Sequence, residues 1–168
     1  PIPGIQDFID YLESTDRSWL CITNNATRTP EMFVEKLARM QIRASTQNVL
    51  GSAVATAHWM AQKFPDGGKV IMVGQEGLRR ALLENGFEET IDPDEADYAV
   101  VGMHFELTFE ELARTALAIR NGAFFVGTNP DPSFPSERGL LPGAGSIIKL
   151  MATTTEVEPV VIGKPNPG

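Results

Sequence analysis

The sequence predicts an α/β fold, with a partial doubly wound, Rossmann-like core of parallel strands into which a second α/β unit is inserted. Short apolar runs alternate along the chain with amphipathic segments of helical period. The helical segments are long enough for right-handed crossovers between neighbouring parallel strands. The composition, 42% hydrophobic and 21% charged over 168 residues, is typical of a globular protein that buries a core.

The first predicted elements are a helix over residues 4–12, a short buried strand over 18–23 and a second helix that starts at Thr29. The apolar residues of the first helix share one face. Thr29 is a hydroxyl cap, and Pro30 suits the first turn of the helix that follows. The stretch from Leu20 to Thr29 is therefore a strand-to-helix turn.

A new series of helices and strands follows from about Ser45. An alanine-rich helix comes first, and Thr108 and Glu111 form a capping box at the start of the last helix in the series. The strands are predicted over 69–74, 97–103 and 123–128, and the helices over 52–64, 76–86 and 108–122.

A stretch rich in Pro, Gly and Ser, residues 129–146, is predicted to be irregular and to act as a hinge. A helix over 147–155 and a buried strand over 159–163 follow it. The pattern divides the chain into a first core segment (1–44), an α/β cap insert (45–128) and a hinge with a return to the core (129–168).

The charge of the chain excludes two classes of partner. The formal net charge is −8, whereas nucleic acids and anionic membranes require a basic surface. We therefore expect a small-molecule ligand, with no nucleic acid and no membrane as partner. Cys21 is the only cysteine, which rules out a disulfide within the chain and favours a reducing, cytoplasmic setting.

The strand predicted over 18–23 ends in small polar residues, Thr23, Asn24 and Asn25. In open parallel sheets, ligands bind beyond the carboxyl ends of the strands, where loops and helix N-termini gather. A hydroxyl, two amides and free backbone N–H groups suit an anion, above all a phosphate. Asn and Thr also form turns through local hydrogen bonds, so a plain turn is the alternative at this point.

A second strand end carries a cation. The apolar run at 159–163 stops at Lys164, and Pro165 restricts the backbone beyond it. A lysine there supplies a point charge to a phosphoryl group or to a carboxylate beside it, although most lysines are simply solvated. We predict that Thr23 and Lys164 converge on a single site that holds an oxyanion.

Four short motifs resemble a known family. ITNNATRT at 22–29 and IGKPNPG at 162–168 resemble the second and third motifs of phosphatases in the haloacid dehalogenase superfamily. GTNPD at 127–131 and RGLLPGAGS at 138–146 resemble its type IIA branch, which includes 4-nitrophenyl, pyridoxal phosphate and phosphoglycolate phosphatases. In that branch the cap lies between the two motifs, and the resemblance covers essentially the whole chain.

The resemblance implies a Mg²⁺-dependent phosphomonoesterase that acts on small phosphorylated metabolites through an aspartyl-phosphate. Thr23 and the backbone of Asn24 would bind the transferring phosphoryl oxygens, with Asn25 beside them. Lys164 would stabilise the nucleophile and the phosphoryl charge. By this interpretation the stretch from Leu20 to Thr29 is a phosphate cradle.

The resemblance also implies further contacts around the substrate. Asn129 and Asp131 would lie near it, at the return from cap to core, although both residue types also form turns. His104 follows a cap strand and would face the substrate from there; a plain loop histidine is the alternative. Caps of this branch also form dimer surfaces, so a homodimer through the cap is expected.

Two motifs of the family are absent from the 168 residues, namely D-x-D-G with the nucleophile and the acidic motif that binds Mg²⁺. Asp92 and Asp94 do spell D-x-D, but a proline separates them and no apolar strand precedes them, so they are interpreted as a solvated loop. We expect the sequence to be a fragment lacking both ends, with its metal ligands outside this chain and no turnover of its own.

Two other classes of protein remain open. One is a non-catalytic α/β module that binds a phosphorylated ligand or a partner protein without chemistry. The other is a nucleotide-binding regulator, which the absence of a G-x-x-x-x-G-K loop disfavours.

Overall fold

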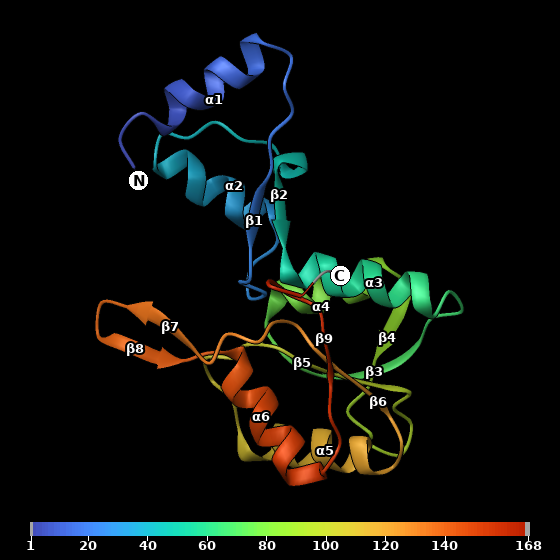
Figure 1. Cartoon of the computed structure of the whole chain (residues 1–168). Coiled ribbons are helices and arrows are strands. Elements are labelled where there is room, and N and C mark those ends of the chain that lie inside the picture. Colours follow the sequence, from blue (N-terminus) through green and yellow to red (C-terminus); the bar gives the residue numbers. More distant parts are fainter. Residues whose placement is uncertain (1, 167–168) are drawn as a thin grey trace.

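A computed structural model describes residues 2–166 and shows two parts (Figure 1). The smaller part contains α1, α2, β1 and β2, and the larger part contains the remaining elements. The helices are α1 (Ile5–Ser14), α2 (Pro30–Arg39), α3 (Ser52–Lys63), α4 (Glu76–Glu84), α5 (Phe109–Arg120) and α6 (Ala144–Thr155). The strands are β1 (Cys21–Thr23), β2 (Val49–Gly51), β3 (Gly68–Val73), β4 (Phe87–Glu89), β5 (Tyr98–Val101), β6 (Phe124–Gly127), β7 (Ser133–Ser136), β8 (Gly139–Pro142) and β9 (Val160–Val161).

The smaller part contains the strand-to-helix turn that the sequence predicts. The Thr29 hydroxyl accepts a hydrogen bond from the Met32 N–H (3.4 Å), and Pro30 is the first residue of α2. β1 pairs in parallel with β2, which places Thr23 opposite Gly51. The predicted cap and the start of the helix are both confirmed, although β1 is shorter than predicted.

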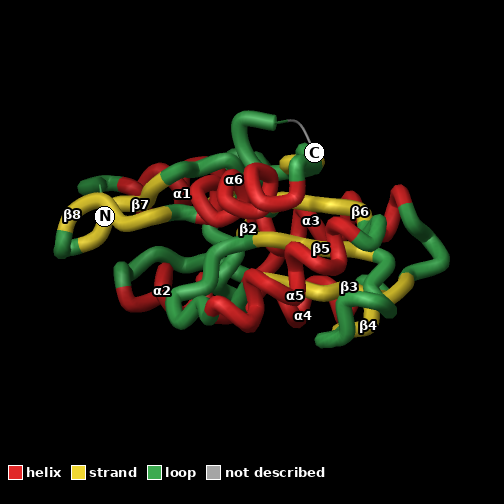
Figure 2. Tube along the Cα trace, turned by 90° about the horizontal axis from the view of Figure 1, so that it is seen from below, coloured by secondary structure: helices red, strands yellow, loops and turns green. Residues whose placement is uncertain are grey.

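The larger part is built on a five-stranded parallel sheet with the strand order β4-β3-β5-β6-β9. Figure 2 shows β6, β5, β3 and β4 side by side in this order. Because side chains alternate along a strand, Ile71 and Val73 pack with α5 and α6 on one face, whereas Val70 packs with α3 and α4 on the other. These three layers confirm the predicted α/β fold with a parallel, doubly wound sheet.

The parallel strands of this sheet end at one common edge. The Gly102 N–H donates to the Val73 carbonyl at 2.7 Å, and the Thr128 N–H donates to the Val101 carbonyl at 2.9 Å. The chain after β9 continues the same ladder, since the Gly163 N–H donates to the Thr128 carbonyl at 3.0 Å. The loops that leave β3, β5, β6 and β9 therefore gather at this edge.

The stretch 129–146 is more ordered than its composition predicts. β7 and β8 form an antiparallel hairpin in which Ser136 lies opposite Gly139. Two prolines, Pro135 and Pro142, lie within these strands. Each strand of a two-stranded ribbon has an open edge, where a proline leaves no hydrogen bond unmade. Because prolines are also frequent in turns, the sequence alone favours a loop here.

The sheet also crosses the predicted boundary at residue 128. β9 pairs in parallel with β6, with Val160 opposite Val126, and α6 packs on the same face as α5. The strand expected in the return segment thus shares a sheet with the strands of the insert, because α6 serves as the crossover between β6 and β9. The division into residues 1–44, 45–128 and 129–168 itself stays a prediction.

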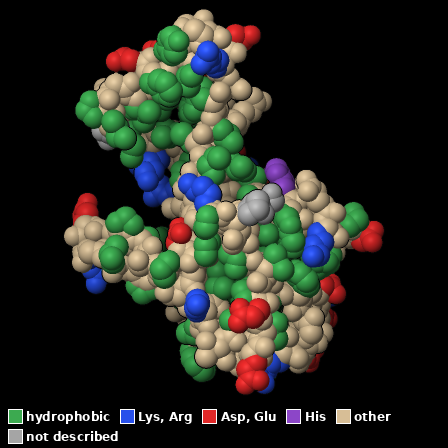
Figure 3. All heavy atoms as spheres, in the orientation of Figure 1, with side chains coloured by type: hydrophobic (Ala, Val, Ile, Leu, Met, Phe, Trp, Pro, Cys, Tyr) green, Lys and Arg blue, Asp and Glu red, His purple; other side chains and the backbone are tan. Residues whose placement is uncertain are grey.

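Most buried apolar side chains lie in the larger part. In the smaller part several apolar side chains are exposed on α1, on β1 and just before β1, and Figure 3 shows hydrophobic surface there. They include Phe8, Tyr11, Leu20 and Ile22. Within residues 2–166, none of the helices combines the length and the apolar character needed to cross a membrane.

Candidate functional site

The candidate site lies where the carboxyl ends of the two parallel sheets meet. β1 ends at Thr23, and the chain that leaves β9 reaches this point at Lys164. The Lys164 ammonium Nζ donates a hydrogen bond to the Ile22 carbonyl at 3.2 Å. The structure therefore brings together the two strand ends that the sequence analysis pairs.

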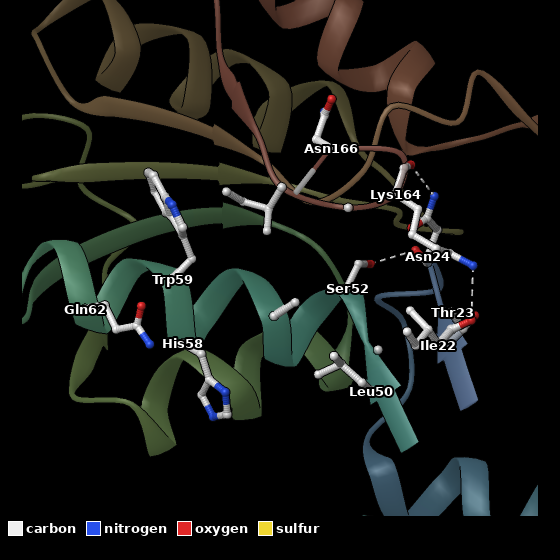
Figure 4. A pocket seen from close by; sticks show the side chains of 14 residues that line it. Ile22, Thr23, Asn24, Leu50, Ser52, His58, Trp59, Gln62, Lys164 and Asn166 are labelled. Carbon is white, nitrogen blue, oxygen red and sulfur yellow. Dashed lines mark hydrogen bonds between the residues drawn. The ribbon is translucent and has the colours of Figure 1, made fainter. Parts of the chain in front are cut away.

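Asn24 holds this junction together through both its side chain and its backbone. Its Nδ2 donates to the Asp131 carboxylate Oδ2 and to the Lys164 carbonyl, each at 2.9 Å. Its own carbonyl accepts from the Ser52 hydroxyl at 2.7 Å and from Asn129 Nδ2 at 2.8 Å. Figure 4 shows the contacts of Asn24 with Ser52 and Lys164. Four segments far apart in the sequence thus meet at this residue.

Thr23 and Lys164 line the same cavity, which has a volume of about 280 Å³ (Figure 4). The Thr23 hydroxyl oxygen accepts a hydrogen bond from the Asn25 N–H at 3.2 Å, which leaves its proton available to a ligand. The Lys164 side chain is exposed and carries two further N–H donors. Both side chains thus offer donors to the same cavity, and their joint binding of an oxyanion stays a prediction.

A second cavity, of about 230 Å³, adjoins the first on the other side of Thr23 and Asn24. Its polar wall includes Asn129 and Asp131, which the sequence analysis places near the substrate. Its apolar wall consists of Met103 and Phe105 from the loop after β5 and Phe134 from β7. The rings of Phe105 and Phe134 meet edge to face, with their centroids 5.9 Å apart.

Two of the predicted site residues use their side chains within the protein. The Asn25 Oδ1 accepts from the N–H and the hydroxyl of Thr27, both at 2.8 Å, which is the local turn that the sequence analysis keeps as an alternative. Asn129 is 4% exposed, and its amide oxygen accepts from the Asp131 N–H at 3.2 Å. Both residues line the second cavity and shape the loops around Thr23.

His104 does not line either of these two cavities. Its imidazole lies beside α5, with Nδ1 at 3.2 Å from the Glu111 carboxylate Oε1, and it borders a separate cavity of about 390 Å³. The apolar wall comes instead from its neighbours, Met103 and Phe105. Sequence reasoning missed these two because it searched this loop for polar groups.

Glu111 is the ionisable group whose pKa changes most clearly in this region. Burial alone would raise the pKa of its carboxyl, but hydrogen bonds from the Thr108 hydroxyl and N–H and the charges of His104 and Arg114 outweigh burial. The net effect holds the pKa of Glu111 below its ordinary value. Its ionised form is therefore favoured by folding.

The Glu111→Gln change in the full-length protein is expected to lower the melting temperature at pH 7, by on the order of 2–4 °C. Because folding lowers the pKa of Glu111, its stabilisation is complete above the unfolded pKa and disappears as the pH falls through the folded pKa. Thermal unfolding at pH 7 and at pH 3 measures this, and the deficit should shrink at pH 3. An equal loss of melting temperature at pH 7 and at pH 3 would contradict the stabilising role of the ionised Glu111 carboxylate.

Comparisons with known proteins identify relatives of the chain. A family model described as haloacid dehalogenase-like hydrolase matches residues 1–88. The chain is 47% identical over 167 residues to the acid sugar phosphatase of Staphylococcus aureus (strain USA300). The matched region covers 99% of this chain and 63% of that protein. The chain thus spans less than two thirds of the length of this curated relative.

Solved structures share the fold over nearly the whole chain. A hypothetical protein from Pyrococcus horikoshii OT3 matches with a TM-score of 0.93 and 42% identity, covering 98% of this chain and 66% of that one. Glycerol phosphate phosphatase from Mycobacterium tuberculosis, solved in complex with magnesium, matches with a TM-score of 0.92 and 34% identity, covering 99% and 50%. Since the family model alone covers more than half of the sequence, the chain belongs to the haloacid dehalogenase-like hydrolases.

Proposed function

We propose that this chain is part of a phosphatase that hydrolyses phosphomonoesters of small metabolites, and that Thr23 and Lys164 bind the phosphoryl group. The single observation that carries the proposal is the junction of the two strand ends, where Lys164 Nζ lies 3.2 Å from the carbonyl of Ile22, the residue before Thr23. The names of two similar proteins, acid sugar phosphatase and glycerol phosphate phosphatase, support a phosphatase that acts on small phosphoesters.

The proposed chemistry gives each side chain a separate task. The Thr23 hydroxyl donates a hydrogen bond to a phosphoryl oxygen, and the N–H of Asn24 does the same from the strand tip. The Lys164 ammonium offsets the charge that builds up on the phosphoryl oxygens during transfer. The Asn24 side chain holds the backbone at Lys164 through that residue's carbonyl, so the strand end that carries the ammonium is in place before a substrate arrives.

The nucleophilic aspartate and the Mg²⁺ ligands are proposed to come from parts of the full-length protein outside this chain. Across residues 2–166, no three His, Cys, Asp or Glu side chains come close enough together to hold a metal ion. At the junction, the Asp131 carboxylate already accepts a hydrogen bond from Asn24. The role that we propose for the described residues is to bind and orient the phosphoryl group.

The Thr23→Val change tests the proposal, because valine keeps the shape of threonine and removes the hydroxyl. In the full-length protein assayed with p-nitrophenyl phosphate and Mg²⁺, we expect kcat/KM to fall roughly 10- to 100-fold, the loss typical of one hydrogen bond to a charged group. Thr153→Val, on an exposed position of α6, is the matched control and should stay within about twofold of wild type, as surface changes usually do.

The outcome also separates the two classes of function. A full-length protein that hydrolyses no phosphomonoester contradicts the proposed activity. If that protein still binds inorganic phosphate, and loses the binding with Thr23→Val, the non-catalytic binding module is supported instead.

A further inference from the structure

The loop between β5 and α5, residues 102–108, presents alternate side chains to opposite sides. Met103 and Phe105 line the second cavity, across from Thr23 and Asn24. His104, between them, points away from that cavity and toward α5, where it contacts Glu111. Met103 also packs against the core between α5 and α6, whereas Phe105 is largely exposed, so the direction of Phe105 depends most on how the loop is held.

The Glu111 carboxylate contacts both ends of this loop. Its Oε2 accepts from the Thr108 N–H at 2.8 Å and from the Thr108 hydroxyl at 2.6 Å, which closes the capping box of α5. Its Oε1 lies 3.2 Å from His104 Nδ1. That nitrogen is buried and makes no hydrogen bond with any of the described residues, and the Glu111 carboxylate is the polar group that faces it.

Phe105 has little other support for its position. Its side chain is 59% exposed, and its ring meets Phe134 of the β7–β8 hairpin. A large exposed apolar side chain on a loop is otherwise free to rotate into solvent. A fixed backbone at His104 limits that freedom and keeps Phe105 in the wall of the cavity.

We infer that Glu111 and His104 are positioning residues that hold Met103 and Phe105 against the organic group of the substrate. The inference rests on the proposed function, because it assumes that the second cavity receives the part of a phosphomonoester beyond the phosphoryl group. It adds a specificity that the phosphate contacts lack: the apolar wall favours substrates whose organic group is flat or apolar. Neither positioning residue touches the reacting atoms.

The test compares two substrates in the full-length protein and its Glu111→Gln and His104→Phe variants. Glutamine at this position can still cap α5, so Glu111→Gln removes the charge next to His104 and leaves the capping box in place. For p-nitrophenyl phosphate, both variants should raise KM roughly two- to fivefold, the range that a partly exposed ion pair supports. For glycerol phosphate, which has no aromatic group, KM should change little, and kcat should be retained for both substrates.

The double variant Glu111→Gln/His104→Phe shows whether the two residues affect KM through their mutual contact or independently of each other. If the two residues act through each other, the double variant is no worse than either single one. Glu110→Gln is the matched control, since Glu110 lies on the same turn of α5, is exposed and pairs with Arg114. Equal losses for both substrates, or a double variant whose effect is the sum of the single ones, would overturn the inference.

A second measurement keeps the inference separate from the proposed function. Amide hydrogen exchange over residues 103–107 reports the loop whether or not the protein is active. Exchange there should speed up in Glu111→Gln and His104→Phe and stay unchanged in Glu110→Gln. Unchanged exchange in all three variants overturns the inference, whereas faster exchange in a protein without phosphatase activity contradicts only the proposed function.

Discussion

Replacing Lys164 with methionine in the full-length protein is expected to lower kcat for p-nitrophenyl phosphate roughly 10²- to 10³-fold, the loss typical of removing a donor to a developing oxyanion. Methionine keeps most of the length of the side chain and removes its charge. The fold should survive, because the Lys164 side chain is exposed and, among residues 2–166, makes a single hydrogen bond, to the Ile22 carbonyl. Steady-state kinetics with circular dichroism of the variant measure both effects.

Lys149→Met is the matched control for this change. Lys149 is exposed on α6 and lines neither cavity at the junction. Its replacement removes the same charge from the protein, so any effect of net charge on substrate attraction appears in both variants. A Lys164→Met variant that keeps kcat close to that of Lys149→Met would contradict the role proposed for Lys164.

Gly163→Ala is expected to destabilise the protein by about 1–3 kcal/mol, the usual cost of overpacking. A Cβ at this position would lie 2.6 Å from the Thr128 carbonyl oxygen, 2.7 Å from Asn129 Cβ and 2.9 Å from Asn24 Oδ1. Asn24 and Asn129 are held by hydrogen bonds at the junction, so they cannot move without breaking those bonds. Urea unfolding of the full-length variant measures the loss, and phosphatase activity should fall with it.

Gly51→Ala provides the comparison. Gly51 lies opposite Thr23 at the end of β2. The atom closest to a Cβ added at Gly51 would be the Asn25 carbonyl oxygen, at 3.3 Å. A shift of a few tenths of an ångström relieves this contact, so the loss should be clearly smaller than for Gly163→Ala. Equal unfolding midpoints for the two variants would show that the close approach at Gly163 is not what limits stability.

The parts of the fold that the sequence predicts are those with strong local signals. Thr29 and Pro30 mark the start of α2, and Thr108 with Glu111 mark the start of α5, because capping chemistry acts within one turn. The sequence pattern does not predict β2 or β4, which have three residues each. Such short strands exist because a neighbouring strand pairs with them, and that pairing leaves no periodic pattern in the strand itself.

The same contrast holds for the candidate site. The ends of two apolar runs point to Thr23 and Lys164, and these lie close together because the carboxyl ends of the two parallel sheets meet. The apolar wall could not be predicted in this way. Met103 faces the second cavity and His104 faces α5, where it contacts Glu111, and neither direction can be read from the sequence of the loop. Phe134 lies in a hairpin whose prolines and glycine indicate irregular chain.

The contacts of Asn24 have a consequence for the order in which the protein is assembled. They join Asn24 to Asp131, 107 positions later in the sequence, and to Lys164, 140 positions later. A chain emerging from the ribosome therefore exposes Thr23 and Asn24 long before Asp131 and Lys164 have been synthesised. Closing so large a loop costs conformational entropy, which opposes the formation of the junction. The helices and strands of the larger part can pair locally in the meantime, so folding of the candidate site should be among the last events of biosynthesis.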